Sequence, residues 1–270
     1  MTEQNKELTR DPKQYLPTVK AMLSNQQNLP SLPPMVSALQ GNLKSFNFAQ
    51  VDKVIKQDPT LTASILKVSN SALFKRPVPV ASLKDAIATL GLGTVQSLVV
   101  AHQLKGLFQT RDDTLNQCLT QRWESTQRLA TCSKKMANLL NMDGDLAYLC
   151  AILSDLGSSL IAQEFSQFQL IDEQPSFNWV ANHYAHLISA HLLQFWKFDE
   201  LLWLPIKKKG QWDYRSPDGL ALPEIMNMCW VHTLNSENTP ELEKMPRFQE
   251  IPPTLRILAS ERQFLLLKEY

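Results

Sequence analysis

At 270 residues the chain is long enough for one large domain or two closely packed sub-domains. Hydrophobic residues make up 44% of the chain and charged residues 20%, which is typical of globular proteins and excludes extensive disorder. The 27 basic residues nearly balance the 26 acidic ones, and this net charge of +1 argues against a chain-wide surface for binding nucleic acid.

Cysteines and apolar runs indicate the compartment. The four cysteines are scattered, with no CxxC pair, and are expected to be buried, reduced thiols: Cys118, Cys132, Cys150 and Cys229. The polar N-terminus lacks the apolar core of a signal peptide, and no apolar run approaches the ~20 residues that span a bilayer. We therefore expect a cytoplasmic protein with no membrane partner.

The predicted elements are helices, because apolar residues recur at helical spacing and strand-like alternation is scarce. Residues 29–34, rich in proline, predict an extended lead-in. A short helix follows, with three apolar residues on one face: Val51, Val54 and Ile55. The next helix is predicted to begin with Asp58 as N-cap and Pro59 at the first position.

Helix signals continue through the first half. The helix after Pro59 has a stripe predicted to be buried: Leu61, Ile65, Val68 and Ala72. Ser82 is predicted to cap another helix, with Asp85 three residues on, and Gly91 stands where a C-terminal glycine is expected. Thr94 is predicted to cap a further helix that runs to about Phe108.

Residues 111–114 predict a break between two halves of the chain. Helices are then expected at about 116–140, from near 143, at about 178–196, from near 199, and after 253, with a loop at 207–223. The helix from Asp143 has an apolar face beside a stripe of small residues: Ala147, Ala151, Ser154 and Ser158. Because neighbours can approach such a helix on two sides, we predict that it is the centre of a bundle.

Several segments together resemble the HDOD family. In the first half these are Asp58-Pro-Thr-Leu-Thr-Ala63, Asn70-Ser-Ala-Leu-Phe74, Ser82 to Ile87 and Leu90-Gly-Leu92. In the second half the matching segments are Trp123-Glu-Ser125, Ala151-Ile-Leu-Ser-Asp-Leu-Gly157 and Ala185 to Trp196. The resemblance covers about residues 28–208 and implies an all-α, two-lobed helical bundle whose C-terminal lobe is HD-domain-like.

The resemblance also implies a division of the chain. We predict an N-terminal extension at 1–27, an N-terminal helical lobe at 28–112 and an HD-like helical lobe at 113–210. Residues 211–270 are predicted to form a loop and a C-terminal helical extension.

The resemblance also relates the chain to the catalytic HD hydrolases, the parent superfamily of the HDOD family. The residues with which those enzymes hold a metal are mostly absent from this sequence. Ser154 stands where the resemblance places the histidine of the His-Asp dyad, so only Asp155 is kept. Glu124 and Ala185 stand where two other histidines are expected, and Lys209-Gly210 replaces a His-His pair. One carboxylate beside a serine cannot hold a catalytic divalent ion. We therefore predict no catalytic residue, no metal site and no cofactor.

Two alternatives stay open at these positions. Asp155 is expected to cap or pair with a neighbouring helix, as lone carboxylates in helices usually do. A rearranged metal site would instead need Asp155, Glu124, His183 and His186 to converge. Lysines 207–209 could meet phosphate, but a short lysine run more often lies in a solvated loop.

The functional hypothesis follows from the resemblance and from the missing ligands. The resemblance to HDOD proteins implies a role in bacterial signal transduction, in some cases in circuits that use cyclic di-nucleotides. We predict a non-catalytic regulatory module that binds a protein partner or a nucleotide signal, with nucleic acid an unlikely partner. The alternative is a metal-dependent phosphohydrolase with a rearranged HD-type site.

Overall fold

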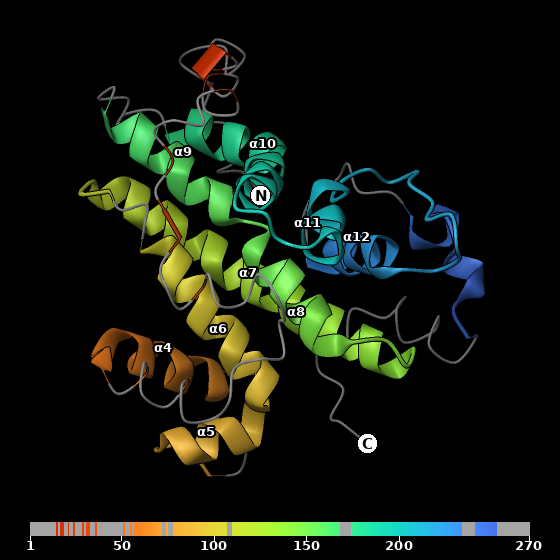
Figure 1. The fold of residues 1–270 in the computed structure, drawn as a ribbon, viewed down its shortest axis with the longest axis horizontal. Helices are drawn as coiled ribbons and strands as arrows, with labels where there is room; N and C mark the ends of the chain where they lie inside the picture. The colour runs from red at the N-terminus through yellow and green to blue at the C-terminus, as the bar shows by residue number, and fades with distance from the viewer. Residues whose placement is uncertain are drawn as a thin grey trace, which may run out of the picture.

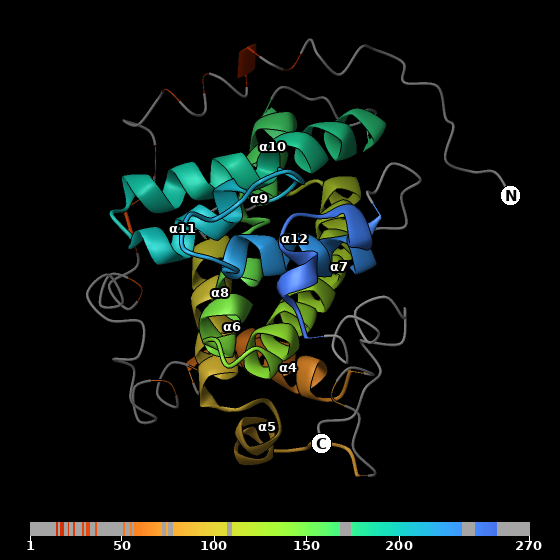
Figure 2. The same ribbon diagram turned by 90° about the vertical axis from the view of Figure 1, so that its right-hand side faces the viewer.

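The computed structural model describes residues 57–71, 78–106, 110–167, 174–233 and 241–252, with isolated positions in the first 74 residues. Helices dominate these residues and no strand occurs among them, so the predicted all-α class is confirmed (Figure 1). The first three helices described, α4, α5 and α6, form one lobe, and α7 to α12 form the other. At the junction α6 packs against α8 and α9 (Figure 2).

Helix α4 (Pro59–Ser69) starts as predicted. The Asp58 carboxylate accepts hydrogen bonds from the backbone N–H groups of Thr60 at 2.9 Å and Leu61 at 3.1 Å, and Pro59 occupies the first position. The predicted inward stripe is buried at Leu61, Ile65 and Val68, whereas Ala72 lies outside the described residues. Of the preceding predicted helix, Val51 and Ile55 are helical and buried, and Val54 is not described.

Asn70 connects the end of α4 to the segment that leads into α5. Its side-chain amide donates to the Val80 carbonyl at 2.8 Å, and its side-chain oxygen accepts from the Val80 N–H at 2.8 Å. The side chain thereby satisfies two backbone groups that have no helix or strand partner. This pairing gives a structural reason for asparagine at this position.

Helices α5 (Leu83–Leu90) and α6 (Leu92–Lys105) meet at a sharp corner of 110°. Ser82 caps α5 by accepting from the Asp85 N–H at 3.1 Å, as predicted. Gly91 has φ +81° and forms the whole corner. The predicted start of the next helix at Thr94 was wrong, because this glycine lets α6 begin at once. The predicted end near Phe108 lies outside the described residues, and α6 ends at Lys105.

Lys134 of α7 (Asp113–Leu139) holds this corner against the second lobe. Its ammonium donates to the Leu90 carbonyl at 3.3 Å, the Thr94 hydroxyl at 2.6 Å and the Asp145 carboxylate at 2.8 Å. Thr94 is therefore a buried acceptor inside α6 rather than a helix cap. One lysine thus connects both helices of the corner to the start of α8.

The predicted central helix from Asp143 is two helices. α8 (Gly144–Leu153) and α9 (Leu156–Gln167) are separated by Ser154 and Asp155, so the single-helix prediction was wrong at this point. At the break the Ser154 hydroxyl donates to the Ala151 carbonyl at 2.8 Å, which competes with the helical backbone bond. Together the two helices are apolar enough to cross a membrane, but 83% of that window is buried inside the molecule. Their central position is confirmed.

The remaining helices surround this pair. These are α10 (Gln174–Phe195), α11 (Glu200–Lys207) and α12 (Leu222–Thr233), followed by short 3₁₀ turns at Leu242–Lys244 and Phe248–Glu250. Helix α11 starts after Asp199 as predicted, whereas α7 starts after Asp112, within the break predicted at 111–114 and before the predicted start at about 116. Helix α12, which packs against α7 and α11, was not predicted from the sequence. The predicted helix after residue 253 lies outside the described residues, and the four-part division of the chain stays a prediction.

Candidate functional site

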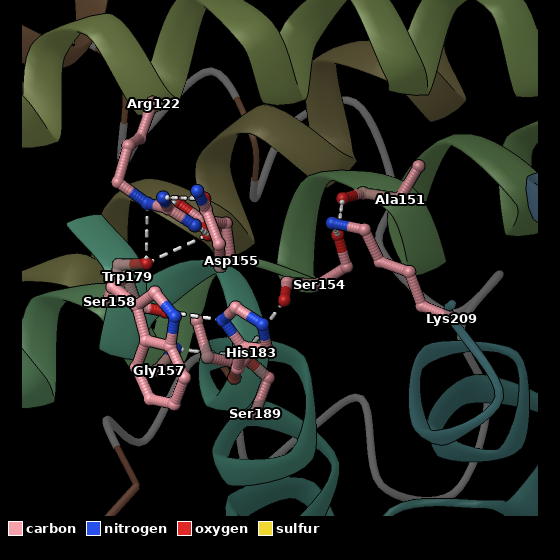
Figure 3. Close-up of polar contacts among 12 residues, drawn as sticks. Arg122, Ala151, Ser154, Asp155, Gly157, Ser158, Trp179, His183, Ser189 and Lys209 are labelled. Carbon is pink, nitrogen blue, oxygen red and sulfur yellow. Dashed lines mark hydrogen bonds and ion pairs between the residues drawn. The ribbon is translucent and has the colours of Figure 1, made fainter. Parts of the chain in front are cut away.

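The break between α8 and α9 places Asp155 inside the molecule, facing α7 and α10. Figure 3 shows its carboxylate beside the Arg122 guanidinium, with Ser158 next to both and with Lys209 reaching Ser154 from the other side. Four segments therefore meet around Asp155: α7, the α8–α9 break, α10 and the turn after α11.

Asp155 forms a two-point ion pair with Arg122. The Arg122 Nη2 lies 2.6 Å from Asp155 Oδ1 and its Nε lies 3.1 Å from Oδ2. Both side chains are largely buried, with exposed fractions of 16% for arginine and 12% for aspartate. Two parallel charge-assisted hydrogen bonds fix the carboxylate in position. Asp155 therefore pairs with a neighbouring helix, one of the two outcomes that the sequence left open.

Two polar side chains complete this ion pair. The Ser158 hydroxyl accepts from Arg122 Nε at 2.8 Å and donates to Asp155 Oδ1 at 2.8 Å. Arg122 Nη1 donates to the Asn182 side-chain oxygen at 2.7 Å. Burial by itself would raise the pKa of Asp155, but Arg122, then Lys209 and Ser158, lower that pKa below its ordinary value. The carboxylate is therefore ionised at neutral pH.

Lys209 is buried, which corrects the expectation of a solvated lysine run. Only 8% of the residue is exposed, and its ammonium donates to the Ser154 hydroxyl at 3.2 Å and lies 4.6 Å from the centre of the Trp230 ring. Asn227 of α12 fixes this turn by donating to the Lys208 carbonyl and accepting from the Gly210 N–H. The expectation holds for Lys207, which is exposed.

Lys105, at the end of α6, is a further cation near this site, and no sequence pattern indicated it. Its ammonium lies 3.9 Å from the centre of the Trp123 ring, next to Arg122 in α7. Burial lowers the pKa of Lys105 to about 8, with Asp155 opposing and Arg122 adding to the effect. Burial likewise lowers the pKa of Lys209 to about 8, and again Asp155 opposes this effect whereas Arg122 adds to it.

The other candidate ligands do not converge on Asp155. Glu124 is exposed and lies 3.6 Å from Lys67. His183 is exposed, stacks on the Trp179 ring and donates from Nδ1 to the Trp179 carbonyl at 2.8 Å. Of these candidates only His186 is close enough for the charges of Asp155 and Lys209 to affect its pKa. Burial, followed by Lys209, lowers this pKa to about 3, so the imidazole is neutral.

These donors do not fit a catalytic divalent ion. Within the described ranges no three His, Cys, Asp or Glu side chains gather in one place. Both Asp155 oxygens already accept from Arg122, and the Ser154 hydroxyl donates to a backbone carbonyl and accepts from Lys209. A divalent ion would therefore compete with resident cations for one carboxylate.

Arg122, Asn182 and Lys105 are the residues around Asp155 that were missed from the sequence. Arg122 directly precedes the Trp123-Glu-Ser125 segment and is 33 positions from Asp155, so no local pattern connects the two. The one signal in the sequence was the position of Arg122, a cation directly before a segment that resembles the family.

Comparison with known proteins agrees with this fold. No curated protein sequence matches the chain. A solved structure of a candidate metal-dependent phosphohydrolase from Shewanella amazonensis SB2B superposes with a TM-score of 0.63 at 18% identity, covering 84% of this chain and 85% of that one. An HDOD domain protein of unknown function from Geobacter sulfurreducens gives a TM-score of 0.58 at 20% identity, covering 95% and 93%.

A second Shewanella amazonensis SB2B protein, a candidate phosphohydrolase, gives a TM-score of 0.55 at 22% identity, with 91% of this chain and 87% of that one covered. At these identities the likeness establishes the fold alone. The model of the HDOD domain matches residues 29–211, which is more than half of the sequence. The chain belongs to the HDOD family.

Proposed function

We propose that the protein is a non-catalytic regulatory module of bacterial signal transduction, acting by binding a protein partner or a nucleotide signal. The observation that carries this proposal is the two-point Arg122–Asp155 ion pair. In this pair the Arg122 guanidinium holds the Asp155 carboxylate, which the resemblance to HD hydrolases makes the first candidate for a metal ligand.

The chemistry of this pair supports a role without turnover. A metal-dependent phosphohydrolase needs an ion that lowers the pKa of a bound water and leaves a coordination position open for it. A guanidinium has no open coordination position and cannot activate water in this way. Because Lys209 and Lys105 add positive charge around the same carboxylate, they further oppose a divalent cation.

The competing hypothesis is a phosphohydrolase with a rearranged site. The observation that favours it is His186, since a neutral imidazole is the form that binds metal and this one senses the charge of Asp155. Two donors are fewer than the three or more that a catalytic site provides.

A hydrolysis assay separates the two hypotheses. The full chain, purified without chelators, is incubated with a chromogenic phosphodiester and with Mn²⁺, Mg²⁺ or Zn²⁺ in turn, alongside Asp155→Asn. We expect equal, background rates for both proteins with every ion. Turnover that needs a metal and is lost in Asp155→Asn would refute the regulatory proposal.

A cytoplasmic location forms part of this proposal. All four cysteines are buried and none is in a disulfide, which suits a reducing compartment. The one long apolar segment is mostly packed inside the molecule. Affinity purification of the full chain from bacterial lysate, followed by reciprocal purification with the captured protein, is the experiment that identifies a protein partner.

A further inference from the structure

Residues 241–252 form a segment of two 3₁₀ turns that lies beside α12 (Figures 1 and 2). Its backbone hydrogen bonds close within the segment, for example from the Lys244 N–H to the Glu241 carbonyl at 3.0 Å and from the Ile251 N–H to the Phe248 carbonyl at 3.2 Å. Three of its described side chains are nonetheless buried: Met245, Phe248 and Ile251. The contacts described for this segment therefore join it to the rest of the molecule through side chains.

Arg247 connects the segment to α12. Its Nε lies 3.5 Å from the Glu224 carboxylate, and its Nη2 donates to the Ser216 carbonyl. The exposed fraction is 18% for the arginine side chain and 2% for the glutamate side chain. Among the described residues the buried Nε–H has no acceptor with hydrogen-bond geometry. The anchor of the segment is therefore a buried ion pair whose hydrogen bonding is incomplete.

Docking of the segment is opposed as well as favoured. Arg247 has φ +61°, a left-handed backbone conformation that costs free energy for a residue with a Cβ. Burial of its ion pair with Glu224 removes both charges from water, and their attraction offsets only part of that cost. Burial of the three apolar side chains favours docking. Because these contributions oppose one another, we expect the segment to open at a lower free energy than the helical core.

The same glutamate holds one end of the loop after α11. Glu224 accepts from the Ser216 N–H at 2.5 Å and from the Ser216 hydroxyl at 2.8 Å. Arg247 donates to the carbonyl of this serine, so all three polar groups of Ser216 bind the ion pair. Release of the segment would remove Arg247 from both partners and leave Glu224 as a buried charge without its cation, which favours rearrangement around Ser216.

Asn227 holds the other end of this loop, one turn further along α12. Its side chain donates to the Lys208 carbonyl at 3.0 Å and accepts from the Gly210 N–H at 2.8 Å. Lys209 lies between these two residues and is buried. Helix α12 therefore fixes residues 208–216 at both ends, and the end at Ser216 depends on the 241–252 segment.

We propose that residues 241–252 form a releasable strap. While docked, the segment keeps the loop at 208–216 in place and Lys209 buried; its release loosens this loop and uncovers the apolar side chains of the segment. A ligand that binds one of the two forms more tightly would shift the population toward that form. This inference rests on the proposed regulatory function and names a conformational change that would carry the regulation.

The test is hydrogen exchange of the full chain, followed by mass spectrometry, with and without urea below the unfolding transition. Amides that open locally exchange with little dependence on urea, whereas amides that need global unfolding depend on it steeply. We expect the first behaviour in 241–252 and 208–216 and the second in α8 and α9. Steep urea dependence in all of these regions would overturn the proposal, and local opening of 241–252 without 208–216 would overturn the link to the loop.

Variants test the anchor. Arg247→Met should lower the protection of 241–252 and 208–216 about tenfold or more, while α8 and α9 stay protected. Lys244→Met is the control, since it removes an exposed ion pair with Glu241 inside the segment and should leave protection unchanged. Equal effects of the two changes would overturn the role of Arg247.

A double variant keeps the test valid if Arg247→Met does not fold. Arg247→Met with Glu224→Gln removes both buried charges, and the amide oxygen can still accept from Ser216, so most of the protection should return. No recovery would show that the charge pair does not govern docking. Exchange that is global throughout, with background hydrolysis, would remove this inference alone. Metal-dependent hydrolysis that is lost in Asp155→Asn would remove the proposed function instead.

Discussion

The Arg122 guanidinium contacts both carboxylate oxygens of Asp155, at 2.6 and 3.1 Å, across 33 positions of sequence. The pair joins α7 to the break between α8 and α9, the segment that the sequence resemblance aligned with the His-Asp dyad of HD hydrolases. The protein therefore stabilises this buried carboxylate with a side chain of its own.

Replacing Arg122 should destabilise the fold. Arg122→Met leaves Asp155 as an uncompensated buried charge, so we expect the free energy of unfolding to fall by about 3 kcal/mol at neutral pH. Urea denaturation measures this loss. Arg128→Met removes an exposed arginine of the same helix, which donates a hydrogen bond to the Ser125 hydroxyl, and should change stability by less than about 0.5 kcal/mol.

A double variant separates the pair from its parts. Arg122→Met combined with Asp155→Asn removes both charges, so it should lose less than the sum of the single variants, with a coupling of at least about 1 kcal/mol. Additive losses would show that the two charges do not depend on each other.

Gly157 should not tolerate a methyl group. A Cβ at this position would overlap the Ala185 carbonyl and lie 2.8 Å from the Ile188 Cβ, so α9 and α10 would have to separate. We expect Gly157→Ala to cost about 2 kcal/mol or more by urea denaturation. Gly106→Ala is the control, since its φ of −60° suits alanine and its nearest neighbours lie at 3.5 Å or beyond. An equal effect of the two changes would refute the close helix contact.

Lys134→Met should loosen the junction between the lobes. The variant leaves the Thr94 hydroxyl, the Leu90 carbonyl and the Asp145 carboxylate without their shared donor, and we expect a loss of about 2 kcal/mol. Hydrogen exchange should also speed up at the start of α6. Lys67→Met breaks an exposed ion pair with Glu124 and should be nearly neutral, so a comparable loss there would contradict this role for Lys134.

Asp58 contributes to the stability of the folded protein in a way that depends on pH. Hydrogen bonds from Thr60 and Leu61 lower its pKa to about 2, with a smaller contribution from His102. Because the folded-state pKa lies below the unfolded value of about 3.9, the stabilisation is present above that value and is lost as the pH falls toward 2. Asp58→Ala should therefore lower the melting temperature at neutral pH and converge with the wild type near pH 2. A constant difference down to pH 2 would contradict this assignment.

Local signals were the part of the fold that the sequence could predict. Asp58, Ser82 and Gly91 act within a few residues of their own position, and each lies where its pattern indicated. The helix start at Thr94 was wrong because Gly91 lets α6 begin at Leu92, and the Thr94 hydroxyl instead accepts from Lys134, 40 positions away. The break at Ser154 was missed because the apolar pattern continues through it.

The site was less predictable than the fold. Asp155 was identified through the family segment that contains it, but its partner Arg122 comes from a helix whose register against α9 no local pattern encodes. Lys209 was placed in solvent because a lysine run is usually solvated, whereas Asn227 in the unpredicted helix α12 turns it inward. Charges brought together by packing are visible only in three dimensions.

The most direct test of the central claim is calorimetric titration of Mn²⁺ or Zn²⁺ into wild-type protein, Asp155→Asn and Arg122→Met. If Arg122 takes the place of the metal, wild type and Asp155→Asn should give the same weak, non-saturating heats. Stoichiometric binding to the wild type that disappears in Asp155→Asn would contradict the claim, because it would show that Asp155 remains available as a metal ligand.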